Sequence, residues 1–162
     1  MALSESARAA SAQESVFRQI YRQSTGRVAS LIALDPASEH VVSRAVAADP
    51  ARRRVVELPR SNVGGDWIAE LRGRAQTLLD GANGADLVVL IVKAGTDSAV
   101  GALFGEACRL RGVPVTVLVI DSATHTEADL SRTLAPLRQI STMLVVATGS
   151  DYVDDMLAAL RA

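Results

Sequence analysis

The run Leu87–Val92 (LVVLIV) constrains the fold more than any other stretch, because every residue in it is apolar. A strand with one face in water alternates apolar and polar residues, whereas a strand covered on both faces is apolar throughout. A short polar turn and a segment with apolar residues at helical spacing follow directly, ending at Gly112. We therefore expect a strand, a turn and a helix at the centre of an α/β domain, with helices on both faces of a parallel sheet.

Strand and helix patterns alternate along the rest of the chain. The five predicted strands are Val28–Leu34, Arg54–Leu58, Leu87–Val92, Val115–Ile120 and Thr142–Ala147. Helical periodicity follows each of them, and Asp35–Pro36 and Asp66 are typical helix starts. This pattern predicts a three-layer Rossmann-like α/β sandwich with a five-stranded, mostly parallel sheet. For five alternating units the strand order that we expect is 2-1-3-4-5.

The first 25 residues differ from the rest of the chain. A helix over residues 12–23 is predicted by apolar positions at helical spacing, which are Val16, Phe17, Ile20 and Tyr21. We expect this helix to dock on the domain or on a second subunit. Residues 26–162 then form a single Rossmann-like domain, since the length suits one ordinary domain and no repeat or linker interrupts it.

Charge and composition exclude several classes of function. The chain has 17 basic and 18 acidic residues and a net charge of −1, which gives no electrostatic footprint for nucleic acid. Its apolar runs are too short to span a bilayer, and the N-terminus lacks an apolar signal core, so we expect a cytoplasmic protein. Cys108 is the only cysteine, which excludes an intramolecular disulfide and a multi-cysteine metal site, and we expect no metal. The run Arg52–Arg54 is either a solvated segment or a patch for an anion.

Polar residues follow the predicted strands, and the turns after parallel strands meet at the sheet edge where ligands bind. The ligand-binding candidates are Asp35, Lys93, Gly95, Thr96, Ser98 and Asp121. The turn Lys93–Ser98 brings amides and hydroxyls to a helix start, which suits an anion, although Asp97 puts a negative charge in the same place. Further polar residues in these turns are Ser38, Arg60, Ser61, Asn62, Ser122 and Thr148–Asp151.

Each candidate also has a purely structural interpretation. Helix capping explains Asp35, Thr96, Asp97 and Asp151. Asp121 can order its own turn, and Lys93 can extend into solvent instead of facing a phosphate or carboxylate. A buried helix stripe explains Cys108, and surface positions near helix starts explain His40 and His125. No P-loop, no dinucleotide fingerprint after a strand and no nucleophile elbow is present, so we expect no catalytic residue and name no cofactor.

Three segments resemble the GTP-binding domain of the FtsZ/tubulin-like family. They are GGDWIAELRGRAQTLLDGANGADLVVLIVKAG, ALFGEACRLRGVPVTVLVI and LAPLRQISTMLVVATGSDYVDDML. The resemblance implies a nucleotide-binding fold. The family's first glycine-rich loop corresponds to Asp35–Glu39 (DPASE), and only Gly95 and Thr96 of its second loop carry over. The domain that brings the catalytic acidic loop is absent, so the resemblance implies a degenerate member without GTPase activity.

The sequence therefore favours a non-catalytic binding or interaction module that forms homo-oligomers or binds a protein partner. The alternative is an enzyme that binds a small molecule or nucleotide at the carboxyl edge of the sheet, with Lys93, Thr96, Ser98 and Asp121 around the ligand. A third alternative is a subunit whose activity needs another chain. Neither nucleic acid nor a membrane is an expected partner.

Overall fold

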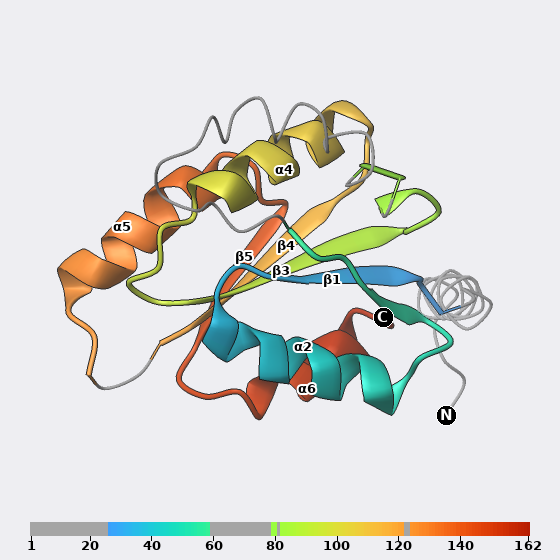
Figure 1. Cartoon of the computed structure of the whole chain (residues 1–162), viewed down its shortest axis with the longest axis horizontal. Coiled ribbons are helices and arrows are strands. Elements are labelled where there is room, and N and C mark those ends of the chain that lie inside the picture. Colours follow the sequence, from blue (N-terminus) through green and yellow to red (C-terminus); the bar gives the residue numbers. More distant parts are fainter. Residues whose placement is uncertain (1–25, 59–78, 81, 122–123) are drawn as a thin grey trace, which may run out of the picture.

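Figure 1 shows a computed structural model of the chain, which describes residues 26–58, 79–80, 82–121 and 124–162. The elements are β1 (Ala29–Ala33), α2 (Pro36–Ala48), β2 (Arg53–Val55), β3 (Leu87–Lys93), α4 (Ala99–Leu110), β4 (Val115–Ile120), α5 (Glu127–Arg138), β5 (Met143–Ala147) and α6 (Tyr152–Ala159). Several predictions fall outside the described residues: the helix of residues 12–23, the long helix that starts at Asp66, and the candidates Arg60, Ser61, Asn62 and Ser122.

The five strands form one parallel sheet in the order β2-β1-β3-β4-β5. Helices α2 and α6 cover one face, and α4 and α5 cover the other (Figure 1). The strand order reverses between β1 and β3, as in the flavodoxin-like arrangement of doubly wound sheets. The predicted three-layer Rossmann-like fold and the predicted strand order are confirmed.

Strand β3 is the centre of the sheet, and its side chains from Leu87 to Val92 are at most 2% exposed. Alternate residues enter two separate cores, one on each face of the sheet. Val88, Leu90 and Val92 pack with residues of α4 and α5. Leu87, Val89 and Ile91 pack with residues of α2 and α6. A strand with two buried faces needs an apolar side chain at every position, which explains why this run has no polar residue.

Strand β2 departs from its predicted bounds, because it begins at Arg53 and ends at Val55 instead of covering Arg54–Leu58. The Arg53 side chain is buried and donates three hydrogen bonds to main-chain oxygens. Its Nε and Nη2 bond the oxygen of Ala162 at 3.1 and 3.0 Å, and its Nη1 bonds that of Ala45 at 2.9 Å. Both interpretations of the basic run are therefore wrong for Arg53, which ties the end of α6 to β2 and α2.

Helix α5 shows how local sequence sets the element ends. Thr126 precedes it and forms a capping box with Asp129, so two main-chain amides at the helix start are satisfied by side chains. Helix α4 lies close to the segment after α5, since a Cβ added at Gly105 would lie 2.5 Å from Cδ1 of Ile140. In the part of the chain that the structure describes, no helix has the length and apolar character needed to cross a membrane.

Candidate functional site

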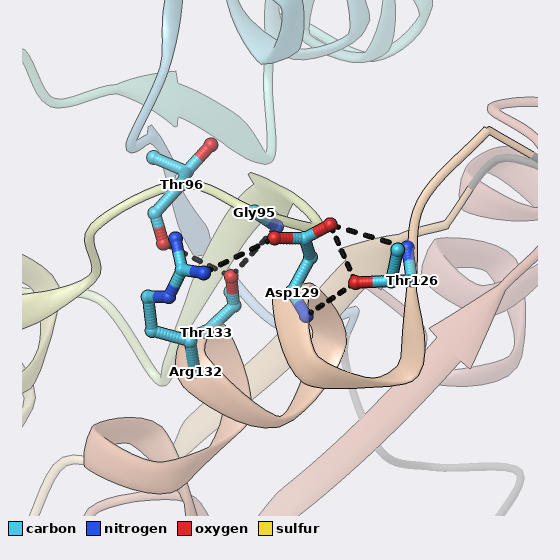
Figure 2. A network of polar contacts seen from close by, with 6 residues as sticks. All are labelled: Gly95, Thr96, Thr126, Asp129, Arg132 and Thr133. Carbon is cyan, nitrogen blue, oxygen red and sulfur yellow. Dashed lines mark hydrogen bonds and ion pairs between the residues drawn. The ribbon is translucent and has the colours of Figure 1, made fainter.

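The turn after β3 is bonded to α5 by Thr133, a fully buried residue (Figure 2). The Gly95 amide donates to Oγ1 of Thr133 at 2.9 Å, and that hydroxyl donates to the main-chain oxygen of Thr96 at 2.9 Å. The hydroxyl of Ser98 donates to the main-chain oxygen of Thr133 at 2.8 Å. Gly95 has a φ of +88°, a conformation that glycine adopts without strain. The Gly95 amide and the Ser98 hydroxyl, two of the groups that suit an anion, are thus engaged within the protein.

Asp35 also makes structural hydrogen bonds with both of its carboxylate oxygens. Its Oδ1 accepts from the amide of Ser38 at 2.9 Å, which caps the start of α2. Its Oδ2 accepts from the Ser38 hydroxyl and from the amide of Lys93, each at 2.7 Å. Asp35 therefore joins the carboxyl ends of β1 and β3, and the helix-cap interpretation describes its contacts.

The start of α4 carries its own negative charge. Oδ1 of Asp97 accepts from the amide of Ala99 at 3.0 Å, and the Thr96 amide donates to the main-chain oxygen of Lys93 at 3.2 Å. A carboxylate at a helix N-terminus is favourable for the helix, but it repels a second anion at the same place. This arrangement disfavours a phosphate at the turn.

Asp121 and His125 form a pair at the carboxyl end of β4. Nδ1 of His125 lies 3.5 Å from Oδ1 of Asp121, and the two side chains are 17% and 29% exposed. The separation is within ion-pair range, although this buried Oδ1 accepts no hydrogen bond. The imidazole also borders the turn after β3, since a Cβ at Gly95 would lie 3.7 Å from Cδ2 of His125. Lys93, the remaining candidate, is exposed at the end of β3.

His125 was predicted at the surface near a helix start, and its side chain is half-buried there, at 17% exposed. The sequence did contain a signal, because Asp121 and His125 are four residues apart directly after a predicted strand. A four-residue separation within one turn at the carboxyl edge allows the contact. A pair of an acid and a histidine at such a place was therefore open to prediction.

A groove of about 720 Å³ lies beside Asp35, between the start of α2, the end of β2 and the start of α4. Its apolar lining includes Leu34, Val42, Val55, Val56, Leu58 and Val100. Among the described residues, its ionisable lining consists of the carboxylates of Asp35, Glu39, Glu57 and Asp97. No lysine, arginine or histidine of the described residues lines it. The groove adjoins the point where the strand order reverses, which is the usual ligand position in open α/β sheets.

Of the predicted candidates, the lining of the groove includes Asp35 and does not include Lys93, Gly95, Thr96, Ser98 or Asp121. Sequence reasoning missed Glu39 and Glu57, because one lies inside a helix and the other follows a short strand whose end was placed too late. For the described residues, no three side chains of His, Cys, Asp or Glu are grouped so that they could hold a metal ion.

Besides the Glu106–Arg109 pair on α4, two titratable groups of the described residues have pKa values displaced by their surroundings. Burial raises the pKa of the Cys108 thiol to about 11, so this side chain is a packing residue without thiolate character. The hydrogen bond from the Thr126 hydroxyl, followed by that from the Thr126 amide, lowers the pKa of Asp129. Arg132 bonds the other oxygen of this carboxylate at 3.2 Å (Figure 2). Both displacements have structural causes and neither activates a reacting group.

No protein-family model and no curated protein matches the sequence. Similar solved structures include the receiver domain of the response regulator NarL from Mycobacterium tuberculosis, with 18% identity, a TM-score of 0.45, and 85% of this chain and 98% of that chain covered. A 2-deoxyribosyltransferase from Bacillus psychrosaccharolyticus has 14% identity and a TM-score of 0.46, with 81% and 95% covered. A receiver domain of a LuxO repressor protein from Vibrio parahaemolyticus has 13% identity and a TM-score of 0.43, with 83% and 90% covered.

The predicted membership of the FtsZ/tubulin-like family is wrong. The similar structures are receiver domains and a deoxyribosyltransferase, and none of the three is FtsZ-like or tubulin-like. The resemblance rested on the apolar pattern of strands and helices, which every doubly wound sheet needs in order to bury both faces. At the segment aligned with the family's first glycine-rich loop, Asp35 caps a helix.

Proposed function

We propose that this protein is a non-catalytic binding module and that its groove takes a small cation with an apolar body. The observation that carries the proposal is the lining of the groove, where the carboxylates of Asp35, Glu57 and Asp97 meet an apolar surface. An ammonium or guanidinium group would neutralise the carboxylates, while its hydrocarbon part would be buried against the valines and leucines. A nucleotide would bring further negative charge to the same place.

The proposed lack of catalysis is supported by the bonding of the polar groups at the sheet edge. Asp35, the Gly95 amide and the Ser98 hydroxyl make their hydrogen bonds to other groups of the protein. A catalytic group needs a free hydrogen-bonding position toward a substrate. Groups that hold the fold together in this way serve as scaffold for a binding groove.

Thermal shift measurements test the ligand class. Tyramine should raise the melting temperature, whereas tyrosol, which replaces its ammonium with a hydroxyl, and ATP should not. Glu57→Gln should reduce the shift, because it removes one of the lining charges. Glu106→Gln is the matched control, since Glu106 pairs with Arg109 on α4 and is not part of the lining. A shift with ATP and none with the amine would refute the proposed ligand class.

A second function is favoured by the Asp121–His125 pair. A carboxylate beside an imidazole is the arrangement that orients a histidine as a general base, and it would suit an enzyme at the carboxyl edge of the sheet. Turnover of a substrate there should be lost in His125→Gln and retained in His40→Gln, whose side chain is exposed on α2. If an activity is found that survives His125→Gln, this second function is wrong.

We further propose that residues 26–162 form one domain that self-associates in the cytoplasm, and that residues 1–25 add a docking helix. The near-neutral charge supports self-association, because copies with a small net charge repel one another weakly. Light scattering with and without residues 1–25 tests the docking helix. If the number of subunits and the stability are both unchanged after the deletion, the helix does not have its proposed role.

A further inference from the structure

The outer edge of β2 carries main-chain groups that bond nothing within the described residues. The Val56 amide donates to the main-chain oxygen of Leu31 at 3.0 Å, so the ladder with β1 continues beyond the last residue of β2. Val56 and Leu58 both pack in the core beneath α4 and α5, so the segment is extended as far as Leu58. Neighbouring residues of an extended segment direct their main-chain groups to opposite sides. Those of Val55 and Glu57 therefore face away from β1.

The groove lies directly beside this edge. The Arg53 side chain reaches Ala45 of α2. Side chains alternate along a strand, so those of Val55 and Glu57 lie on the same face as that of Arg53. Residues from both faces of the edge line the groove of about 720 Å³, and they are Val55, Val56, Glu57 and Leu58. Val55 is 47% exposed, so apolar surface and unpaired main-chain groups occur together.

The charges along the edge specify what can pair with it. Residues 54–57 read Arg-Val-Val-Glu, and the arginine and the glutamate are both exposed. In an antiparallel pair, opposite charges directly across from each other are stabilising and like charges are destabilising. The complementary strand therefore has a basic residue opposite Glu57, apolar residues opposite the two valines and an acidic residue opposite Arg54. Read from its amino end, its order is basic, apolar, apolar, acidic.

A second copy of this chain has the same order of residues but does not fit in this register. Two edges pair through residues whose main-chain groups face each other. In each copy these residues are Val55 and Glu57. A pairing of the arginine with the glutamate would instead set Val56, whose amide bonds β1, opposite Val55. The occupant that fits the charges is thus a separate segment, whose main chain is free on the side that faces β2.

We infer that this edge binds an extended segment of a partner protein, which adds to the sheet as an antiparallel strand and reads basic, apolar, apolar, acidic. The residues of the segment opposite Val55 and Glu57 exchange main-chain hydrogen bonds with them, and the side chains give specificity. The basic side chain beside Glu57 supplies the cation with an apolar body. The inference therefore rests on the proposed function and names its ligand as a side chain of a peptide.

Fluorescence anisotropy of a labelled peptide with the full chain tests the inference. The hexapeptide Thr-Lys-Leu-Val-Glu-Thr should bind saturably. Its matched control, Thr-Glu-Leu-Val-Lys-Thr, has the same composition but sets like charges opposite Arg54 and Glu57, so it should bind about tenfold more weakly. N-methylation of the peptide's valine blocks an amide that faces β2 and should weaken binding about tenfold. N-methylation of its leucine, whose amide faces away, should change binding less than about twofold.

Exchange of the charges of the edge should reverse the peptide preference. In the double variant Arg54→Glu with Glu57→Arg, the control peptide should bind more tightly than Thr-Lys-Leu-Val-Glu-Thr. The matched protein control is Glu106→Arg with Arg109→Glu, which exchanges an exposed pair on α4 outside the groove lining and should keep the wild-type preference. Circular dichroism and urea unfolding establish that each variant is folded.

The outcomes separate this inference from the proposed ligand class. If neither tyramine nor any peptide binds, both are overturned. If tyramine raises the melting temperature but no peptide binds, or if both N-methylated peptides bind alike, the inference alone is overturned. A preference that the double variant does not reverse also overturns it. Peptide binding that appears only after removal of residues 1–25, or only where the chain is monomeric, shows that this segment or a second copy covers the edge, and likewise overturns the inference.

Discussion

Thr133→Val tests whether the turn after β3 is a structural connection to α5. The substitution keeps the branched shape of the side chain and the helix propensity, so its effect comes from the hydroxyl alone. Without Oγ1, the Gly95 amide loses its acceptor and the Thr96 oxygen loses its donor. Leaving a buried polar group unpaired costs about 1–3 kcal/mol. Because Gly95 and Thr96 are half-buried and water reaches them in part, we expect a total loss of about 2–4 kcal/mol.

Urea unfolding followed by circular dichroism measures this loss as a lower midpoint at an unchanged slope. Thr133→Ser keeps the hydroxyl and should lose less than half as much. Thr142→Val is the control for the chemical change itself, because Thr142 is exposed, and it should alter stability by less than about 0.5 kcal/mol. Equal effects of Thr133→Val and Thr142→Val would refute the reasoning. Tighter phosphate binding by the wild type than by Thr133→Val would also refute the reasoning, because it would show that the hydroxyl serves a ligand.

Three further predictions concern buried or capped groups. Arg53→Ala should destabilise the protein by about 2–5 kcal/mol, since it leaves two main-chain oxygens without their donors, whereas the exposed Arg54→Ala should change stability by less than about 0.5 kcal/mol in the same urea assay. Cys108 should resist a thiol reagent at neutral pH, because its pKa of about 11 leaves almost no thiolate, and it should react rapidly in urea; fast labelling of the folded protein would contradict its burial. The pKa of Asp129 is lower in the folded than in the unfolded chain. The contribution of this carboxylate to the free energy of unfolding is therefore full above the ordinary aspartate pKa of 3.8, and it is lost as the pH falls through the pKa of the folded state. Unfolding over a pH series should therefore show wild type more stable than Asp129→Asn at neutral pH, with the difference disappearing in acid; a difference that is constant with pH would contradict this sign.

The fold was open to prediction because its strongest determinants are local and periodic. The apolar run Leu87–Val92 is stable as a strand only when both of its faces are buried. The alternation of strands and helices then limits the possible topologies. The start of α5 is also set locally, by the capping box of Thr126 and Asp129. Strand β2 was misplaced, because its burial depends on a bond from Arg53 to Ala162 that is remote in sequence.

The candidate site was less predictable, because its side chains bond to residues that are remote in the sequence. A residue type shows what a side chain can bond, but the choice between ligand and scaffold depends on partners elsewhere in the chain. Thr133 lies within a helix and carries no motif, yet it takes up the amide of Gly95. The groove depends on the joint placement of α2, β2 and α4, and Glu39 and Glu57 line it together only after folding.

The hydrogen bonds at the end of α6 have a consequence for synthesis on the ribosome. The amide of Arg27, beside β1, donates to the main-chain oxygen of Arg161 at 2.8 Å, and Arg53 of β2 bonds Ala162. The earliest strands to leave the exit tunnel thus share partners with the last described residues. Until those residues emerge, the Arg53 guanidinium lacks the acceptor of two of its three hydrogen bonds. A nascent chain stalled before residue 160 should therefore remain sensitive to protease at β2, and release of the complete segment should end that sensitivity.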